Sequence, residues 1–219
     1  LPLLSRFIFT NRSRFEEIAN KTFKVFCIII VPIVVGTWFL APDIIAIVSG
    51  DGFLESVPVL RVLIFALGLI FFGSYFNMLL VVGNAQKKLM QTLIYAALFN
   101  ISLNLFLIPR YSYMGSAYVS LATEAFVVLL TSMLAYRTIK YRPSFENVKR
   151  ILFSGSIMAL TLFFLEPYSF LLSGIVGVMV YAALLWATRA ITPDEITSLF
   201  QKDTKAPLTE TERIETLVP

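Results

Sequence analysis

The sequence predicts an all-α, polytopic membrane protein: a bundle of about six transmembrane helices. Its 219 residues are 58% apolar and only 15% charged, with a mean hydropathy of +0.80. Soluble domains usually carry roughly 45–50% apolar and about 25% charged residues. The apolar residues are also gathered into runs close to the roughly 20 residues that a helix needs to cross the hydrocarbon core of a bilayer.

Six apolar segments account for the predicted helices. They are Phe23–Ala41, Val57–Val82, Leu89–Ile108, Gly115–Tyr136, Val148–Leu165 and Tyr168–Thr188. Strands of a transmembrane barrel would instead be about 10 residues long and alternate apolar with polar residues. The last two segments are separated by Glu166 and Pro167, and proline cannot continue the hydrogen bonding of a preceding helix. We therefore expect a tight helical hairpin over 148–188.

The connections between the segments predict the rest of the organisation. The first residues resemble the end of a helix, so we expect a C-terminal fragment in which 1–22 is a cytoplasmic loop after a missing helix. Four helices of a C-terminal bundle then span 23–136, with residues 42–56 forming an interfacial turn. A basic cytoplasmic loop follows over 137–147. The polar tail, 189–219, is predicted to contain a short amphipathic helix from Thr192 to about Phe200.

The distribution of positive charge predicts the orientation. Of the 18 Lys and Arg residues, 16 lie in the N-terminal segment, around 84–88, in 137–150 and in the tail. Only Arg61 and Arg110 lie in the alternate connections. Cytoplasmic loops carry an excess of Lys and Arg, so we expect a multi-pass protein of the cytoplasmic membrane with a cytoplasmic C-terminus. This placement explains the net charge of +4 without a nucleic-acid partner.

The composition argues against several kinds of chemistry. The chain has no histidine, and Cys27, in an apolar run, is its one cysteine. These counts exclude Cys/His zinc sites, intrachain disulfides and Ser-His-Asp hydrolysis. No glycine-rich phosphate-binding loop is present. We therefore expect no catalytic residues, no metal and no cofactor.

Glu124 is the sharpest candidate for a functional residue. It lies in an apolar stretch about nine residues into the fourth segment, hence about 14 Å from Gly115 at 1.5 Å per residue. A carboxyl group near the middle of the bilayer must be protonated, paired or facing water. Glu124 is either a site for a coupling ion or substrate, or a protonated acid in one interhelical hydrogen bond.

Other polar residues within the segments have similar alternatives. Asn100 and Asn104 are spaced i, i+4 and therefore share one helical face. They line a polar cavity or join helices by hydrogen bonds, and the same alternatives hold for Tyr75 and Asn77 in the second segment.

Arg61 and Pro32 are the remaining candidate residues. Arg61, at the outer end of the second segment, either extends to the lipid headgroups or binds a pyrophosphate through its two-pronged guanidinium. Pro32 removes a backbone hydrogen bond inside the first segment and is predicted to bend it.

One stretch resembles a known family. Asn100-Ile-Ser-Leu-Asn104-Leu-Phe-Leu-Ile108-Pro109 leads through Tyr111 to Gly115-Ser-Ala117, and Ala122-Thr123-Glu124 follows. This order resembles the polysaccharide-biosynthesis flippases of the multidrug/oligosaccharidyl-lipid/polysaccharide exporter superfamily. The start, Leu1-Pro2-Leu3-Leu4-Ser5-Arg6, and the stretch Val59 to Leu63 are similar to that family too. Ser112-Tyr113-Met114 is a departure, since glycine usually follows the tyrosine sooner.

The resemblance covers about residues 1–140 and implies the last part of a transporter of 12–14 helices. Its substrate would be an oligosaccharide linked to polyprenyl pyrophosphate, moved across the cytoplasmic membrane for surface polysaccharide export. Membrane lipids would surround it, with H⁺ or Na⁺ as a coupling ion, and Arg61 would face the pyrophosphate. The alternatives are a cation-coupled multidrug exporter, a lipid II flippase and, less favoured, a membrane glycan polymerase.

Overall fold

The computed structural model describes residues 8, 11–145, 147–165 and 169–190, and within them the chain is helical with no strands. The helices are α2 (Arg12–Ser49), the 3₁₀ helix η1 (Asp51–Ser56), α3 (Val57–Val82), α4 (Gln86–Ile139), α5 (Val148–Leu165) and α6 (Phe170–Ala187). The five α-helices are long and apolar enough to cross a membrane. The all-α membrane bundle predicted from the sequence is thus confirmed.

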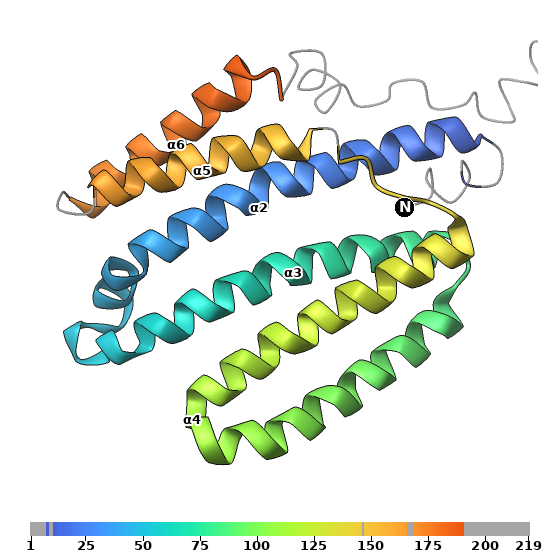
Figure 1. Cartoon of the computed structure of the whole chain (residues 1–219), viewed down its shortest axis with the longest axis horizontal. Coiled ribbons are helices and arrows are strands. Elements are labelled where there is room, and N and C mark those ends of the chain that lie inside the picture. The colour runs from blue at the N-terminus through green and yellow to red at the C-terminus, as the bar shows by residue number, and fades with distance from the viewer. Residues whose placement is uncertain (1–7, 9–10, 146, 166–168, 191–219) are drawn as a thin grey trace, which may run out of the picture.

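The helices pack in a row rather than around one central core (Figure 1). α3 packs against α2 and α4, while α5 packs against α2 and α6, which also contacts α2. The buried side chains extend along this row from Phe15 and Tyr75 to Ile151 and Tyr181. Large apolar side chains are exposed on the remaining faces, for example Leu105 and Phe164, which suits contact with lipid.

α4 is two helical arms, not one long span. Ser112 inside it has φ 50° and ψ −133°, outside the helical region, and the chain reverses there (Figure 1). Gly115 permits the close approach of the two arms, because a Cβ atom at that position would lie 2.5 Å from the carbonyl oxygen of Leu107. The third and fourth predicted segments are these two arms, so the six apolar segments all correspond to helix.

Two predicted loops are wrong in part. Residues 12–22 belong to α2, whose first turn is capped by the Asn11 side chain accepting a hydrogen bond from the Arg14 amide. Phe15 is fully buried there, so tertiary packing extends the helix beyond its apolar segment. Residues 42–49 are also helical, and residues 51–56 form η1 in place of the expected turn. α2 continues through Pro42 and ends before Gly50, whose positive φ of 87° is a conformation that glycine adopts without strain.

The hairpin of the last two helices agrees with the expectation. α5 and α6 match the predicted segments to within two residues, and the Ser173 hydroxyl donates to the carbonyl of Leu165 across the junction. Gly155 of α5 faces Val31 of α2, where its missing side chain lets the two helices come close. The amphipathic helix predicted from Thr192 lies outside the described residues.

The connections alternate between the two ends of the helices (Figure 1). We call one the basic end: the start of α2, the α3–α4 junction, the end of α4 and the start of α5. The other, the opposite end, contains η1, the reversal at Ser112, the end of α5 and the start of α6. Within the described residues, the segments rich in Lys and Arg therefore gather at one end, as the positive-inside rule leads one to expect of a membrane protein.

Two prolines inside α2 leave backbone carbonyls free, and other helices satisfy both. A proline has no N–H for the carbonyl four residues earlier, so Pro32 frees that of Ile28 and Pro42 that of Trp38. The Tyr181 hydroxyl of α6 donates to the Ile28 oxygen at 3.0 Å. Nε of Arg61 on α3 donates to the Trp38 oxygen at 3.0 Å. α2 continues as one helix past both prolines, and the bend predicted at Pro32 stays a prediction.

Candidate functional site

The two arms of α4 are joined inside the membrane by a small polar cluster. Asn100 donates from Nδ2 to the Thr123 hydroxyl at 2.9 Å. Asn104 donates from its own Nδ2 to both the carbonyl and the side-chain oxygen of Asn100, at 3.0 and 2.9 Å. The spacing of the two asparagines therefore placed them on one face as expected. Thr123 is the partner that sequence reasoning did not single out, although it precedes Glu124.

This cluster is not fully satisfied. Oδ1 of Asn104 is buried and has no hydrogen-bond partner. A buried acceptor in that state costs about 1–3 kcal/mol relative to a paired one. Natural structures contain few such groups, and each calls for a reason, such as a ligand or water.

Glu124 lies one residue further along but faces a different helix. It is half-buried and, with Ser120, lines a cavity of about 420 Å³ against the half of α3 that follows η1. The α3 side of this cavity is wholly apolar: Leu60, Leu63, Ile64, Ala66, Leu67 and Ile70. Within the part of the chain that the structure describes, no ion pair or hydrogen bond reaches Glu124. Its carboxyl group is thus available to a ligand that enters this cavity.

Asn77 and Arg61 lie apart from both features. Oδ1 of Asn77 is buried in α3 without a hydrogen-bond partner. The Arg61 guanidinium lies over the Trp38 ring, 5.4 Å from its centroid, in addition to the bond to the Trp38 carbonyl. The structure therefore gives Arg61 a role in holding α3 to α2. Its proposed contact with pyrophosphate stays a prediction.

A second polar network, at the basic end, is complete. The Tyr75 hydroxyl lies 3.0 Å from the carbonyl oxygen of Ala19 and 2.9 Å from the hydroxyl of Tyr141. Tyr141 in turn donates to Oδ1 of Asn20, which also accepts from the Ser144 amide. Burial raises the pKa of Tyr141 to about 12, so its hydroxyl keeps its proton and remains a donor at physiological pH.

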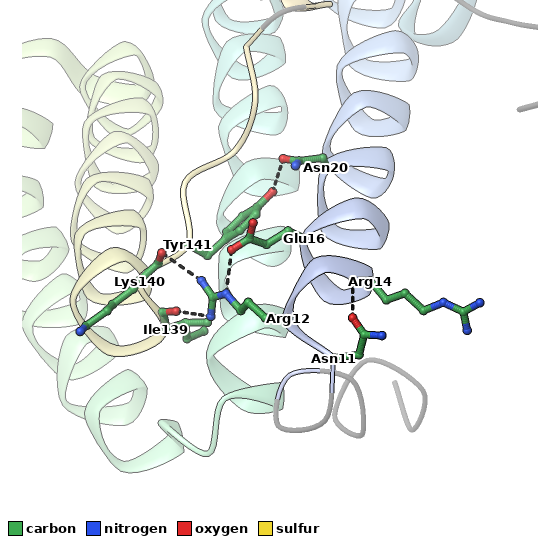
Figure 2. Close-up of polar contacts among 8 residues, drawn as sticks. All are labelled: Asn11, Arg12, Arg14, Glu16, Asn20, Ile139, Lys140 and Tyr141. Atoms are coloured by element: carbon green, nitrogen blue, oxygen red, sulfur yellow. Dashed lines mark hydrogen bonds and ion pairs between the residues drawn. The ribbon is translucent and has the colours of Figure 1, made fainter.

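The same end is fastened by Arg12 at the start of α2 (Figure 2). Its guanidinium donates to the carbonyls of Ile139 and Lys140 at 2.6 and 3.0 Å, where α4 ends, and to Oε1 of Glu16 at 2.7 Å. A cation at the C-terminus of a helix also interacts favourably with the helix dipole. α2 and α4 both pack on α3, and the Arg12 side chain joins the start of α2 to the end of α4.

An aromatic cavity of about 670 Å³ opens between these elements at the basic end. Its walls are formed by residues of three helices: Phe23 of α2, Phe72 and Phe76 of α3, and Val128, Ser132, Met133 and Tyr136 of α4. Residues 141–143 and Phe145, which follow α4, form its rim, and Arg142 is the charged side chain among the lining residues. Sequence reasoning missed this cavity because its walls come from three helices and a loop.

Comparison with known proteins adds no relative. No protein-family profile, curated protein or solved structure matches this chain. Among the described residues, no group of three or more His, Cys, Asp or Glu side chains could hold a metal ion.

Proposed function

We propose that this chain forms part of a transporter that moves a polyprenyl-pyrophosphate-linked oligosaccharide across the cytoplasmic membrane for surface polysaccharide export. The observation that carries the proposal is Glu124: an unpaired, half-buried carboxyl group inside a membrane-spanning arm, beside a cavity between two helices. Ionisable residues within membrane spans are costly and usually mark the paths of ions or substrates. The resemblance of Asn100 to Glu124 to the polysaccharide flippases supports this choice of substrate.

In this proposal the polar residues of α4 have separate tasks. The buried side-chain oxygen of Asn104 would bind a hydroxyl of a passing glycan, or a water, when the two arms of α4 separate. Glu124 binds and releases H⁺ or Na⁺, and its change of charge alters how favourably α4 packs on the apolar face of α3. That difference in packing free energy would shift the equilibrium between the conformation open to one side of the membrane and the conformation open to the other.

A cation-coupled drug exporter is the second candidate, and one observation favours it. Glu124 faces a cavity whose other wall is entirely apolar. An organic cation with a large apolar part would bury that part against α3 and be attracted to the carboxylate, and no path for a glycan would be needed.

Deletion of the gene that encodes the chain, followed by complementation, tests both candidates. Wild type is compared with Glu124→Gln, which keeps size and polarity but removes the charge. Glu55→Gln is the matched control, since Glu55 is an exposed residue of η1. We expect loss of surface glycan with the lipid-linked precursor trapped on the cytoplasmic side, rescued by wild type and Glu55→Gln but not by Glu124→Gln.

Three other results would change the conclusion. Rescue by all three proteins would leave transport standing but remove Glu124 from its mechanism. Unchanged glycan in the deletion strain would overturn the flippase proposal. If drug sensitivity then rises, and Glu124→Gln fails to restore resistance, the exporter is supported instead.

A further inference from the structure

We propose that the aromatic cavity at the basic end is a binding site for one anionic phospholipid of the adjacent leaflet. One acyl chain would lie between α2, α3 and α4, and the phosphate would lie at Arg142. This inference is independent of the proposed function, because it concerns a resident lipid and not the transported molecule.

The depth of the cavity fits half of a bilayer. Its lining reaches from Val128, near the middle of the second arm of α4, to residues 141–143 just beyond the end of that arm. At 1.5 Å per residue, Val128 to Ile139 spans about 17 Å. The hydrocarbon of one leaflet is about 15 Å thick, half of the usual 30 Å. An acyl chain anchored at the rim would therefore reach the innermost walls.

The chemistry of the walls fits a hydrocarbon chain. Three phenylalanine rings in the lining pack together: the centroid of the Phe23 ring lies 5.6 Å from that of Phe72 and 5.7 Å from that of Phe145. The Ser132 hydroxyl, deeper in the wall, is already bonded to the carbonyl of Leu129 at 2.9 Å. The Tyr141 hydroxyl is likewise bonded within the complete network. Because both hydroxyl groups are already hydrogen-bonded to the protein, they do not require water in the cavity.

The charge at the rim fits a phosphate. The Arg142 guanidinium lies over the ring of Tyr136, 4.2 Å from its centroid, and the side chain is exposed. It makes no ion pair or hydrogen bond within the described residues. Stacking on Tyr136 orients the guanidinium while its N–H donors stay open to a phosphate, which arginine can bind with two bonds. Residues 137–150 carry five basic side chains and one acidic side chain, so the neighbourhood also attracts an anion.

Native mass spectrometry of the purified chain tests the site. The chain is released from bilayers containing phosphatidylglycerol and phosphatidylcholine with the same acyl chains. We expect retention of phosphatidylglycerol, reduced several-fold by Arg142→Gln while the weaker retention of phosphatidylcholine is unchanged. Arg137→Gln is the matched control, because Arg137 is exposed on the same end of α4 but does not line the cavity. It should leave retention unaffected.

A second variant separates the acyl site from the charge. Ser132→Leu fills part of the cavity and should lower retention of both lipids, while circular dichroism and gel filtration confirm that the variant is folded. Equal losses in Arg137→Gln and Arg142→Gln would mean diffuse attraction and would overturn the site. So would displacement of the lipid by excess inorganic phosphate, because the cavity walls would then contribute nothing. Preference for a polyprenyl phosphate over phosphatidylglycerol would overturn the phospholipid assignment and assign the cavity to the transported substrate.

Discussion

The two polar networks of this protein differ in how completely their hydrogen bonds are made. At the basic end, Tyr75, Tyr141 and Asn20 each have partners, and Asn20 accepts from two donors. Within the membrane-spanning helices, Asn104 of α4 and Asn77 of α3 each keep a buried oxygen without a partner, and Glu124 has no hydrogen bond or ion pair in the described part of the chain. A complete network stabilises one arrangement of helices, whereas an incomplete one retains the capacity to bind something else.

The difference agrees with what each region joins. The complete network and Arg12 hold α2 against the end of α4 and the loop after it. The incomplete cluster joins only the two arms of α4 and leaves the cavity beside α3 open. We therefore infer that the basic end is the fixed part of this bundle and that a transported molecule or coupling ion would act in the region around Glu124.

The largest expected effect on stability is that of Tyr141→Phe. The change removes two hydrogen-bonded contacts of the Tyr141 hydroxyl, to Tyr75 and to Asn20, and each such contact contributes about 0.5–1.5 kcal/mol. We expect the free energy of unfolding in detergent to fall by about 1–3 kcal/mol, measured by chemical denaturation. Tyr136→Phe is the control, since Tyr136 is exposed at the same end and has no hydrogen bond through its hydroxyl. Equal stability of the two variants would contradict a structural role for the network.

A smaller effect is expected for Tyr181→Phe, which leaves the Ile28 carbonyl without a donor. Interhelical hydrogen bonds in membranes contribute about 0.6 kcal/mol on average and about 1.7 at most, and we expect a loss in that range. Pro32→Ala restores an N–H that can reach the same carbonyl, so Tyr181→Phe should cost less in that background. A double-mutant cycle on unfolding free energies measures the difference. Additive changes would show that Tyr181 does not compensate for Pro32.

The smallest effect on stability is expected for Asn104→Leu. This substitution leaves the side-chain oxygen of Asn100 without its Asn104 donor but also removes the buried Asn104 oxygen that has no partner, so the cost of one unpaired oxygen replaces that of another. We expect unfolding free energy to change by less than about 0.5 kcal/mol, while complementation of the deletion strain fails. A large loss of stability with normal complementation would show that the cluster of Asn100, Asn104 and Thr123 stabilises the fold and does not bind a ligand.

Part of this arrangement could be predicted from the sequence. The shared face of Asn100 and Asn104 follows from their spacing, and the isolation of Glu124 follows from its apolar neighbours. The proline at position 32 indicated a free carbonyl, but the position of Tyr181 that satisfies it could not be derived. Likewise, the sequence offered two roles for Arg61 and omitted its bond to Trp38, which depends on Pro42 and on the packing of α3 against α2.

The sequence by itself determined the all-α membrane class, the six apolar segments, the hairpin of α5 and α6 and the gathering of positive charge in alternate connections. These properties depend on hydrophobicity and local backbone geometry, which can be read along the chain. Only the tertiary structure decided that Glu124 faces α3 while Thr123 faces the other arm, that Tyr181 and Arg61 satisfy carbonyls of α2, and that Arg142 lies at the rim of an aromatic cavity. Such contacts join residues far apart in sequence, and their partners depend on the rotation and crossing of neighbouring helices, for which a single sequence carries no periodic signal.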